Sequence, residues 1–408
     1  MAAFSIEEAK LAVLENVSAI GIETVDLAAA LGRALGAPIV SDCHVPPADN
    51  AGMDGIAVRW EDTRDASPER PVRLRLLGTI GAGQVTDLVV TATCAAKIMT
   101  GAAVPPGADA VIPVEDVEYE GAHAVVRRGA RLGDHVRPMG EDVKAGQRVF
   151  DIGAELTSAH IGVLASLGVA TVPVGKRPRV AIIATGSELV AVSQTPGRGQ
   201  IRNSNSPALV AAAMAAGAIA EDLGHAPDDL AKITERLLGA VVSHDIVISS
   251  GGVSVGEFDF VKSAMKNLGV ELRFDKVAQK PGKPMSYGRI GERTHVFGLP
   301  GNPAAALVCF HVYLKPLIRR LQGFADIETP MAWGRLVGRL ASKGRPSFAR
   351  VIPEATPEGY RVHLAGSQSS GLLLPMALGR ALAHFPARDE PYADGDLVRF
   401  QFLDGGVG

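Results

Sequence analysis

Apolar residues recur at helical spacing at the start of the chain. They stand three or four positions apart, at Ile6, Ala9, Val13 and Val17. This spacing predicts an amphipathic helix over residues 5–18. Ser5 followed by Glu8 forms a capping box, which fixes the beginning of that helix. A second helix is expected over residues 26–35 and a third over residues 158–167.

The pattern is different between residues 46 and 145, where turn signals are frequent. Apolar residues at positions 72, 74 and 76 alternate with arginines, which is typical of a half-buried strand. Pro105-Pro106-Gly107 is one of the turn signals. We therefore expect a β-rich domain over residues 46–145, inserted into an elongated helical domain made of residues 1–45 and 146–177.

Short apolar runs alternate with helical patterns after residue 178. Strands are expected over residues 180–184, 245–249 and 295–299, and helices over residues 207–216, 228–238, 260–268 and from Pro303. This alternation predicts a three-layer α/β/α domain over residues 178–328, with a mostly parallel sheet. Ligands of such sheets bind at loops beyond the carboxyl ends of the strands.

The helical patterns end near Pro330. Five short strands are expected beyond it, over residues 335–340, 349–352, 360–363, 381–385 and 396–402. We therefore expect a separate C-terminal β domain over residues 329–408, which makes the whole chain an α/β multidomain protein.

Composition and charge restrict the classes of function. Hydrophobic residues make up 47% of the 408 residues and charged residues 21%, which is typical of folded domains. The formal net charge is -3 without a long basic run, so no nucleic-acid partner is expected. The cysteines (Cys43, Cys94 and Cys309) are isolated, which disfavours a zinc motif and fits a reducing cytoplasm. No charge-free apolar stretch is long enough to span a bilayer, so no membrane association is expected.

Three glycine-containing loops follow the strands expected in the α/β domain. They comprise residues 184–188, 249–256 and 299–303. Glycines let backbone N–H groups approach a ligand closely, nearby hydroxyls donate to oxyanions, and the start of each following helix favours negative charge. One such loop is equally well explained by a tight turn, but three together favour a bound phosphate or oxyanion. None of the loops has the P-loop or Rossmann glycine spacing.

Charged residues stand beside these loops. Residues 276–284 carry three lysines on a backbone stiffened by two prolines, which suits an oxyanion; the alternative is a solvated surface turn. Glu188 lies in the first loop, and Asp259 follows the second. Carboxylates beside a phosphate site commonly hold Mg²⁺, although a single carboxylate is better explained as a cap or turn residue.

Taken together, these segments resemble the molybdopterin molybdenumtransferase family, which inserts molybdate in the last step of molybdenum cofactor synthesis and includes a domain of gephyrin. The matching segments are Asp49-Asn50, Met53-Asp54-Gly55, Thr100-Gly101-Ala102, Pro106 to Val111, Gly140-Glu141-Asp142, Thr185 to Leu189, Ser250 to Gly256, Lys280 to Pro284 and Pro300 to Pro303. Each segment alone is a weak signal, but their order over most of the chain is specific.

The resemblance implies an elongated domain, an inserted β-rich domain, a three-layer α/β domain and a C-terminal β-barrel-like domain. It also implies a homodimer, with the active site between the α/β domain of one subunit and the β-rich domain of the other. Adenylylated molybdopterin and molybdate are the implied substrates, Mg²⁺ is the implied cofactor and AMP is a product. The upstream molybdopterin adenylyltransferase is a candidate partner.

The resemblance also assigns roles to individual positions. The implied substrate-binding residues are Thr185, Gly186, Ser187, Ser250, Gly251, Gly252, Ser254, Pro300, Gly301, Asn302 and Pro303. The implied molybdate site contains Lys280, Lys283, Arg350 and Ser370, and the implied metal site contains Glu188 and Asp259. The implied catalytic positions are Asp54, Thr100, Arg137, Asp142, Asp228 and Lys276.

The chain departs from the family pattern around Asp54. The family usually has Phe, Ser, Ala and Tyr at the positions of Ala48, Ala51, Gly52 and Ile56. The alanine at position 51 removes a hydroxyl donor near Asp54. The segment Gln368-Ser369-Ser370-Gly371 fits the Gly-Ser-Gly stretch of the family only approximately, which leaves the register at Ser370 open by one residue.

Three alternative functions are compatible with parts of this pattern. The related adenylyltransferase is normally the α/β domain alone, so the flanking domains disfavour it. A non-enzymatic scaffold, such as gephyrin also provides for membrane receptors, is disfavoured because the chain has no long linker or partner domain. A paralogue selective for tungstate stays open, because molybdate and tungstate have nearly the same size and charge.

Overall fold

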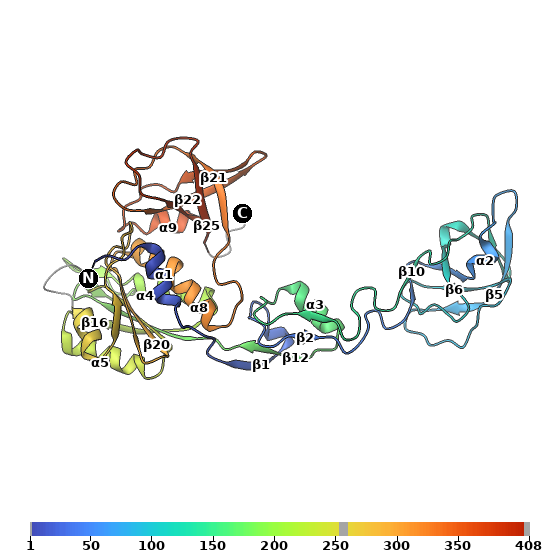
Figure 1. Cartoon of the computed structure of the whole chain (residues 1–408), viewed down its shortest axis with the longest axis horizontal. Helices are drawn as coiled ribbons and strands as arrows, with labels where there is room; N and C mark the ends of the chain where they lie inside the picture. Colours follow the sequence, from blue (N-terminus) through green and yellow to red (C-terminus); the bar gives the residue numbers. More distant parts are fainter. Residues whose placement is uncertain (1, 253–259, 404–408) are drawn as a thin grey trace.

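The computed structural model of the chain describes residues 2–252 and 260–403. Figure 1 shows an elongated molecule in which the α/β region and the C-terminal strands lie together at one end. The strands of residues 50–137 lie at the opposite end, and a narrow connection built from residues 22–40 and 148–175 joins the two ends. No helix in the described ranges is long and apolar enough to cross a membrane.

A six-stranded sheet of order β16-β13-β17-β20-β19-β18 forms the centre of the α/β region. Its strands are β13 (Arg179–Thr185), β16 (Ile219–Ala226), β17 (Ile246–Ser250), β18 (Glu271–Phe274), β19 (Ser286–Ile290) and β20 (Thr294–Leu299). The first four strands in the sheet order are parallel, and the fifth strand, β19, is antiparallel to both of its neighbours, β20 and β18. Helix-covered parallel strands are buried on both faces, which explains the continuous apolar runs in β17 and β20. The prediction of a mostly parallel sheet is confirmed.

Helices cover both faces of this sheet. They are α4 (Asn205–Ala215), α5 (Leu230–Val241), α6 (Phe260–Asn267), α7 (Pro303–Cys309), η3 (Phe310–Leu314) and α8 (Lys315–Leu321). Helices α5 and α6 share one hydrophobic core with the sheet, through residues such as Ile233, Leu237 and Val261. Helices α4, α7 and α8, together with η3, contribute to a second core that also contains Val180 and Ile248. The three layers expected from the sequence are therefore present.

Helix α1 (Ile6–Leu14) begins at the predicted capping box of Ser5 and Glu8. Its buried residues Ile6, Ala9 and Val13 belong to the second of these cores, and α1 contacts α8 and η3. The helix therefore packs on the α/β layers. This differs from the sequence-based expectation, which assigned it to the elongated domain.

The narrow connection consists mainly of strands. Its elements are β1 (Ile22–Asp26), η1 (Leu27–Ala29), β2 (Ile39–Val40), β11 (Arg148–Phe150), α3 (Ser158–Ser166) and β12 (Thr171–Gly175). Strand β1 pairs antiparallel with β12, and Leu35 forms a further bridge to Val174. The helix expected over residues 26–35 is therefore wrong, whereas the helix expected over residues 158–167 is confirmed as α3. The alanines favour a helix, but strand pairing and the burial of Leu35 decide the conformation.

The distal lobe is β-rich, as expected. Its elements are β3 (Asn50–Ala51), β4 (Gly55–Val58), α2 (Trp60–Thr63), β5 (Val72–Ile80), β6 (Cys94–Ile98), β7 (Ala110–Pro113), η2 (Val114–Asp116), β8 (Val117–Glu120), β9 (His123–Val126) and β10 (Val136–Arg137). A sheet of order β7-β4-β6-β5-β9-β8 separates two cores, with Ile56 and Val58 on one face and Ala57 on the other. Strands β3 and β10 form a small separate pair.

The C-terminal region forms a closed barrel of order β21-β23-β22-β24-β25. Its elements are β21 (Met331–Val337), β22 (Ser347–Thr356), β23 (Gly359–Leu364), α9 (Leu374–Leu378), β24 (Ala381–Phe385) and β25 (Leu397–Phe402). Closure leaves no unpaired sheet edge, and the enclosed core contains Phe385, Tyr392 and Phe400. The expectation of a C-terminal barrel is confirmed.

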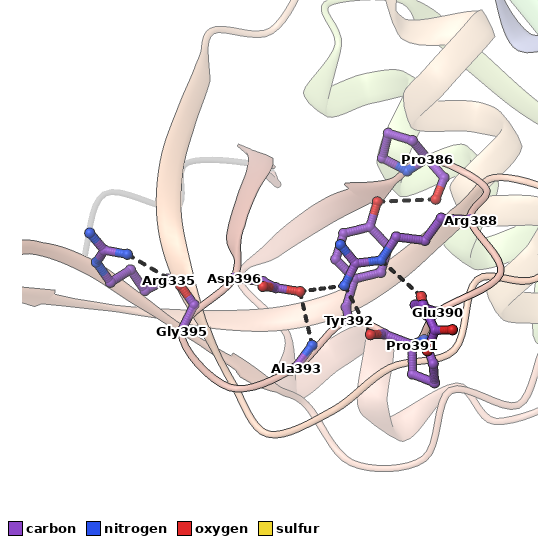
Figure 2. A network of polar contacts seen from close by, with 9 residues as sticks. All are labelled: Arg335, Pro386, Arg388, Glu390, Pro391, Tyr392, Ala393, Gly395 and Asp396. Atoms are coloured by element: carbon purple, nitrogen blue, oxygen red, sulfur yellow. Dashed lines mark hydrogen bonds and ion pairs between the residues drawn. The ribbon is translucent and has the colours of Figure 1, made fainter.

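One turn of the barrel is fixed by Arg388, as Figure 2 shows. The guanidinium lies 3.6 Å from the ring centroid of Tyr392, pairs with Asp396, and donates to the carbonyl oxygens of Glu390 and Pro391 at 2.8 and 2.9 Å. The N–H of Ala393 donates to Asp396 Oδ2 at 2.9 Å. These contacts join the segment between β24 and β25 into one polar network.

Candidate active site

The three glycine loops lie side by side at the carboxyl edge of the parallel strands. Ala184 of β13 lies opposite Ser250 of β17, which lies opposite Leu299 of β20. Neighbouring parallel strands end at the same edge, so the loops that follow them line one pocket of about 720 Å³. The predicted substrate-binding residues in its lining are Thr185, Gly186, Ser250, Gly251, Gly252, Pro300, Gly301, Asn302 and Pro303. Ser254 lies outside the described residues.

Glycine is required at position 251 by close packing of two loops. Gly251 has φ +101°, and a Cβ atom there would lie 2.4 Å from the carbonyl oxygen of Thr185. The Thr185 hydroxyl in turn donates to the carbonyl oxygen of Ser250 at 3.4 Å. The backbones of the first two loops therefore approach each other more closely than any side chain at this position would permit.

Two carboxylates lie at the first loop. Asp228 Oδ2 accepts a hydrogen bond from the N–H of Ser187 at 3.0 Å, and the N–H of Asp228 donates to Ser187 Oγ at 3.1 Å. The carboxylate of Glu188 folds back over Gly186, where a Cβ atom would lie 2.5 Å from Glu188 Oε2. Asp228 and Glu188 both line the pocket, whereas Ser187 supports it through Asp228.

Asn205 is a site residue that the sequence analysis missed. Its Nδ2 donates to Ser250 Oγ at 2.7 Å and to the carbonyl oxygen of Gly301 at 2.8 Å, so it links the second and third loops. It stands at the start of α4, after β14 (Leu189–Val190) and β15 (Ile201–Arg202), and lines the same pocket. The polar run Asn203-Ser204-Asn205, which leads into α4, is the sequence feature that could have indicated this site residue.

A second pocket of about 580 Å³ adjoins the first and shares Pro284, Pro300 and Asn302 with it. Its polar and charged lining comprises Gln279, Lys280, Lys283, Asn302, Arg345, Ser347, Gln368, Ser369 and Ser370. Lys280 and Lys283 are exposed, and Arg345 adds a third cation that the sequence analysis did not single out. Since three donor-rich cations face one cavity, this pocket suits an oxyanion.

Ser370 lies between the two pockets. Asn302 Nδ2 donates to Ser370 Oγ at 3.0 Å, and the N–H of Ala304 donates to the carbonyl oxygen of Ser370 at 3.2 Å. The barrel region thereby joins the third glycine loop at the start of α7.

Arg350 supports the wall of the second pocket. Its side chain is 0% exposed, and its terminal nitrogens donate to the carbonyl oxygens of Ser367, Gln368 and Ser369 at 3.1, 3.2 and 2.9 Å. Burial lowers the pKa of Arg350. These side-chain hydrogen bonds of Arg350 are thus with the loop that lines the pocket, and Arg350 is not among the lining residues.

Asp54 and Thr100 meet in the distal lobe. Asp54 Oδ1 accepts hydrogen bonds from the N–H of Thr100 at 2.6 Å and from its hydroxyl at 2.7 Å. These bonds, the backbone one first, hold the pKa of Asp54 below its ordinary value. Both residues are exposed, and the distal lobe to which they belong lies at the end of the molecule opposite the α/β region (Figure 1).

The other predicted catalytic positions are dispersed. Arg137 of β10 lies opposite Asn50 of β3, the strand that precedes Asp54. The N–H of Asp142 donates to the carbonyl oxygen of Val45 at 3.0 Å. Lys276 accepts a hydrogen bond on its carbonyl oxygen from the N–H of Phe4 at 2.9 Å, outside the described lining of both pockets. Within one chain, the structure therefore brings only Asp228 of this group to the glycine loops.

A divalent cation finds a partial donor set in the first pocket. Asp228 and Glu188 are its described carboxylates, and no group of three potential ligands occurs among the described residues. Asp259, the other predicted metal ligand, lies outside those residues. Mg²⁺ is usually held by one or two carboxylates together with water and substrate phosphates, so two carboxylates fit it.

Fold and site together define a multidomain α/β protein with two adjoining pockets, suited to anionic small molecules, at the carboxyl edge of a parallel sheet. The chain belongs to the molybdopterin molybdenumtransferase family. Residues 4–168 match the MoeA N-terminal region (domain I and II), residues 181–320 match the family described as "probable molybdopterin binding domain", and residues 334–403 match the MoeA C-terminal region (domain IV).

Individual relatives agree with these matches. Molybdopterin molybdenumtransferase 2 of Mycobacterium tuberculosis is 40% identical over 356 residues, which cover 85% of this chain and 87% of the relative. Molybdopterin molybdenumtransferase of Nostoc is 37% identical over 381 residues, covering 92% and 87%. The crystal structure of the molybdopterin biosynthesis MoeA protein from Pyrococcus horikoshii OT3 superposes with a TM-score of 0.86 at 30% identity, covering 98% of this chain and 100% of that one.

Proposed function

We propose that the protein is a molybdopterin molybdenumtransferase that inserts molybdate into adenylylated molybdopterin and releases AMP. The observation that carries this proposal is the junction of the two pockets at Pro284, Pro300 and Asn302. A phosphorylated organic substrate in the first pocket, called here the glycine-loop pocket, would then lie beside an oxyanion in the second pocket. The second pocket is called here the lysine pocket because Lys280 and Lys283 line it. This proximity is what the transfer of an oxyanion to that substrate requires.

The glycine-loop pocket would bind the organic substrate. Backbone N–H groups of Gly252 and Gly301 can approach a phosphate closely because no side chain intervenes, whereas the N–H of Gly251 already donates to the carbonyl oxygen of Leu299 at 3.1 Å. The hydroxyl of Ser250, which accepts from Asn205, is a further donor in the same lining. Asn205 would keep the second and third loops at the spacing that the substrate needs, because it is hydrogen-bonded to both.

The second pocket would bind molybdate through Lys280, Lys283 and Arg345. Molybdate carries two negative charges, and ammonium and guanidinium groups donate to its oxygens while they neutralise it. Ser370 would orient an oxygen of the ion, with Asn302 holding its hydroxyl. Arg350 would act indirectly, by holding the carbonyl oxygens of the neighbouring loop.

Mg²⁺ would be held by Glu188 and Asp228, with Asp259 as a further candidate. Bound there, the ion would neutralise charge on the substrate phosphates as AMP leaves. Because Asp228 Oδ2 accepts a hydrogen bond from the Ser187 N–H, Oδ1 would be the oxygen that binds the ion.

We also propose that the active enzyme is a homodimer in which the distal lobe of one subunit covers the pockets of the other. The exposed pair Asp54 and Thr100 supports this arrangement, because it is hydrogen-bonded and yet lies far from the pockets of its own chain. The apolar side chains next to the pair, Met53 and Met99, are also exposed, as is Met139 on the adjoining loop. Exposed methionines beside polar groups are typical of a contact surface.

A cytoplasmic location and delivery of substrate by the upstream molybdopterin adenylyltransferase belong to the same proposal. Cys94 and Cys309 are buried free thiols, and Cys43 is a partly buried one, which fits a reducing compartment.

The direct test is an assay of the purified protein with adenylylated molybdopterin, molybdate and Mg²⁺ under reducing conditions. We expect release of AMP together with formation of active molybdenum cofactor. Absence of both products would overturn the proposal. Replacing molybdate by tungstate in the same assay measures the metal preference, and omission of Mg²⁺ tests the assignment of Glu188 and Asp228.

A further inference from the structure

A buried amide lies directly beneath the lysine loop of the second pocket. Gln279 is 0% exposed and immediately precedes Lys280. A buried amide is costly unless its donors and acceptor are hydrogen-bonded. The partners of Gln279 therefore indicate what this residue does in the fold.

The partners of the Gln279 amide belong to the lysine loop and to the helical layer. Its Nε2 donates to the carbonyl oxygen of Pro281 at 3.1 Å and lies 3.5 Å from the carbonyl oxygen of Gly282 and from Cys309 Sγ. Its Oε1 accepts from the hydroxyl of Tyr313, a residue of η3 that is 1% exposed. Tyr313 thereby fixes the orientation of the amide, because the donor end must face the loop carbonyls.

The consequence is a loop with its carbonyl oxygens turned inward and its lysines turned outward. Lys280 and Lys283 flank the two carbonyl groups that Gln279 holds, and both lysines are exposed and line the pocket. Gly282 has φ +93°, and a Cβ atom there would lie 2.7 Å from Gln279 Nε2 and 2.6 Å from Cys309 Sγ. The loop is thus packed tightly onto the amide.

We propose that Gln279, oriented by Tyr313, is a positioning residue that holds the Pro281-Gly282 backbone between Lys280 and Lys283 so that both cations face the second pocket. The inference rests on the proposed function, because it takes the lysine pocket as the molybdate site. Gln279 itself acts on the backbone of the loop. Its removal should therefore weaken oxyanion binding without removing any cation.

The test is the binding of inorganic molybdate to the purified full-length protein, measured by calorimetry without the organic substrate. Tyr313→Phe removes one hydroxyl and leaves the ring in place, and Gln279→Leu removes the amide at nearly constant volume. Tyr287→Phe is the matched control, because Tyr287 is 0% exposed and its hydroxyl is hydrogen-bonded to His295 at 2.9 Å in the sheet.

We expect the Kd for molybdate to rise about three- to tenfold in Tyr313→Phe and in Gln279→Leu, the range that the loss of one buried hydrogen bond produces. Tyr287→Phe should lower the melting temperature to a similar extent and leave the Kd unchanged. In the transfer assay, Tyr313→Phe and Gln279→Leu should each raise the KM for molybdate and leave kcat at saturating molybdate unchanged.

Three results would overturn the proposal. The first is an unchanged Kd in both loop variants, and the second is an equal rise in Tyr287→Phe. The third is a wild-type chain that does not bind molybdate, because the pocket is then not an oxyanion site. Failure of the proposed function has a different signature, since molybdate binding and its loss in the variants would persist without AMP release.

Discussion

Asp228 and Ser187 exchange two hydrogen bonds across the first glycine loop, from the Ser187 N–H to Asp228 Oδ2 at 3.0 Å and from the Asp228 N–H to Ser187 Oγ at 3.1 Å. Asp228→Asn preserves an oxygen that can accept from Ser187 but removes the charge. We expect this variant to melt like the wild type and to release AMP at least about tenfold more slowly, because a carboxylate that neutralises developing charge is lost.

Asp229→Asn is the control for this change. The neighbouring carboxylate caps α5 by accepting from the N–H of Lys232 at 3.0 Å, and an asparagine caps equally well. Its rate should match the wild type. Full activity in Asp228→Asn would show that the charge at position 228 is not used.

Gly251→Ala should destabilise the site. At φ +101° the new Cβ would lie 2.4 Å from the carbonyl oxygen of Thr185, so the two loops must separate. Strain of this kind costs about 1–3 kcal/mol, which denaturant unfolding can measure. Gly239→Ala in α5 is the opposite case, because its Cβ would meet nothing within 4 Å and alanine favours the helix. Equal effects of the two changes would contradict the packing argument.

The sequence predicted the parts of the fold that local pattern determines. The apolar runs over β13, β17 and β20 are continuous segments, and the structure has strands there, followed by glycine-containing turns as far as the described residues extend. The elongated connection was mispredicted because pairing of β1 with β12 joins residues about 150 positions apart, as in Ile22 with Gly175. No local pattern reports such a pairing.

The residues of the candidate site also fall into two groups, those that the local sequence predicts and those that it does not. The loop residues around Thr185, Ser250 and Gly301 were predicted because they are close to strand ends. Asn205 was missed, since its two partners are 45 and 96 positions away, and Arg345 was missed because it reaches the lysine pocket from the barrel region. The position of the distal lobe, which contains Asp54, at the far end of the molecule cannot be predicted from the local sequence either.

Asp396 should make the stability of the barrel sensitive to acid. Its hydrogen bond from Ala393, and then its pairing with Arg388, lower the pKa of Asp396 from its ordinary 3.8 (Figure 2). A depressed folded-state pKa contributes stability that is fully present above pH 3.8 and is lost as the pH falls through the lower folded-state value.

The measurement is the melting temperature of wild type and Asp396→Asn across that acidic range. The variant should melt lower than the wild type at neutral pH, and the difference should shrink as the pH falls. Asp389→Asn changes an exposed carboxylate of the same turn and serves as the control. A difference between wild type and Asp396→Asn that does not change with pH would contradict the linkage.

Arg345 should contribute to oxyanion binding although it lies outside the lysine loop. It lines the second pocket, and its Nη1 donates to the carbonyl oxygen of Gln279 at 3.3 Å. Arg345→Gln should raise the KM for molybdate about tenfold at low salt and less at high salt, because the lost interaction is between charges. Lys343→Gln removes an exposed cation two positions away and should leave the KM unchanged. Equal KM values for the two variants would remove Arg345 from the site.

Mixed dimers test whether two subunits build one site. Asp54→Asn would inactivate the contribution of the distal lobe, and Lys280→Ala would inactivate the lysine pocket. In a symmetric dimer with sites shared between subunits, a mixed dimer of these variants has one intact site and one site with both defects. Random pairing after co-expression makes about half of the dimers mixed, so we expect about a quarter of the wild-type AMP release.

Co-expression of Asp54→Asn with Thr100→Ala is the control, because both changes affect the same lobe and every mixed site stays defective. Activity no higher than that of the separate variants in the first pairing would show that Asp54 does not serve the pocket of a partner.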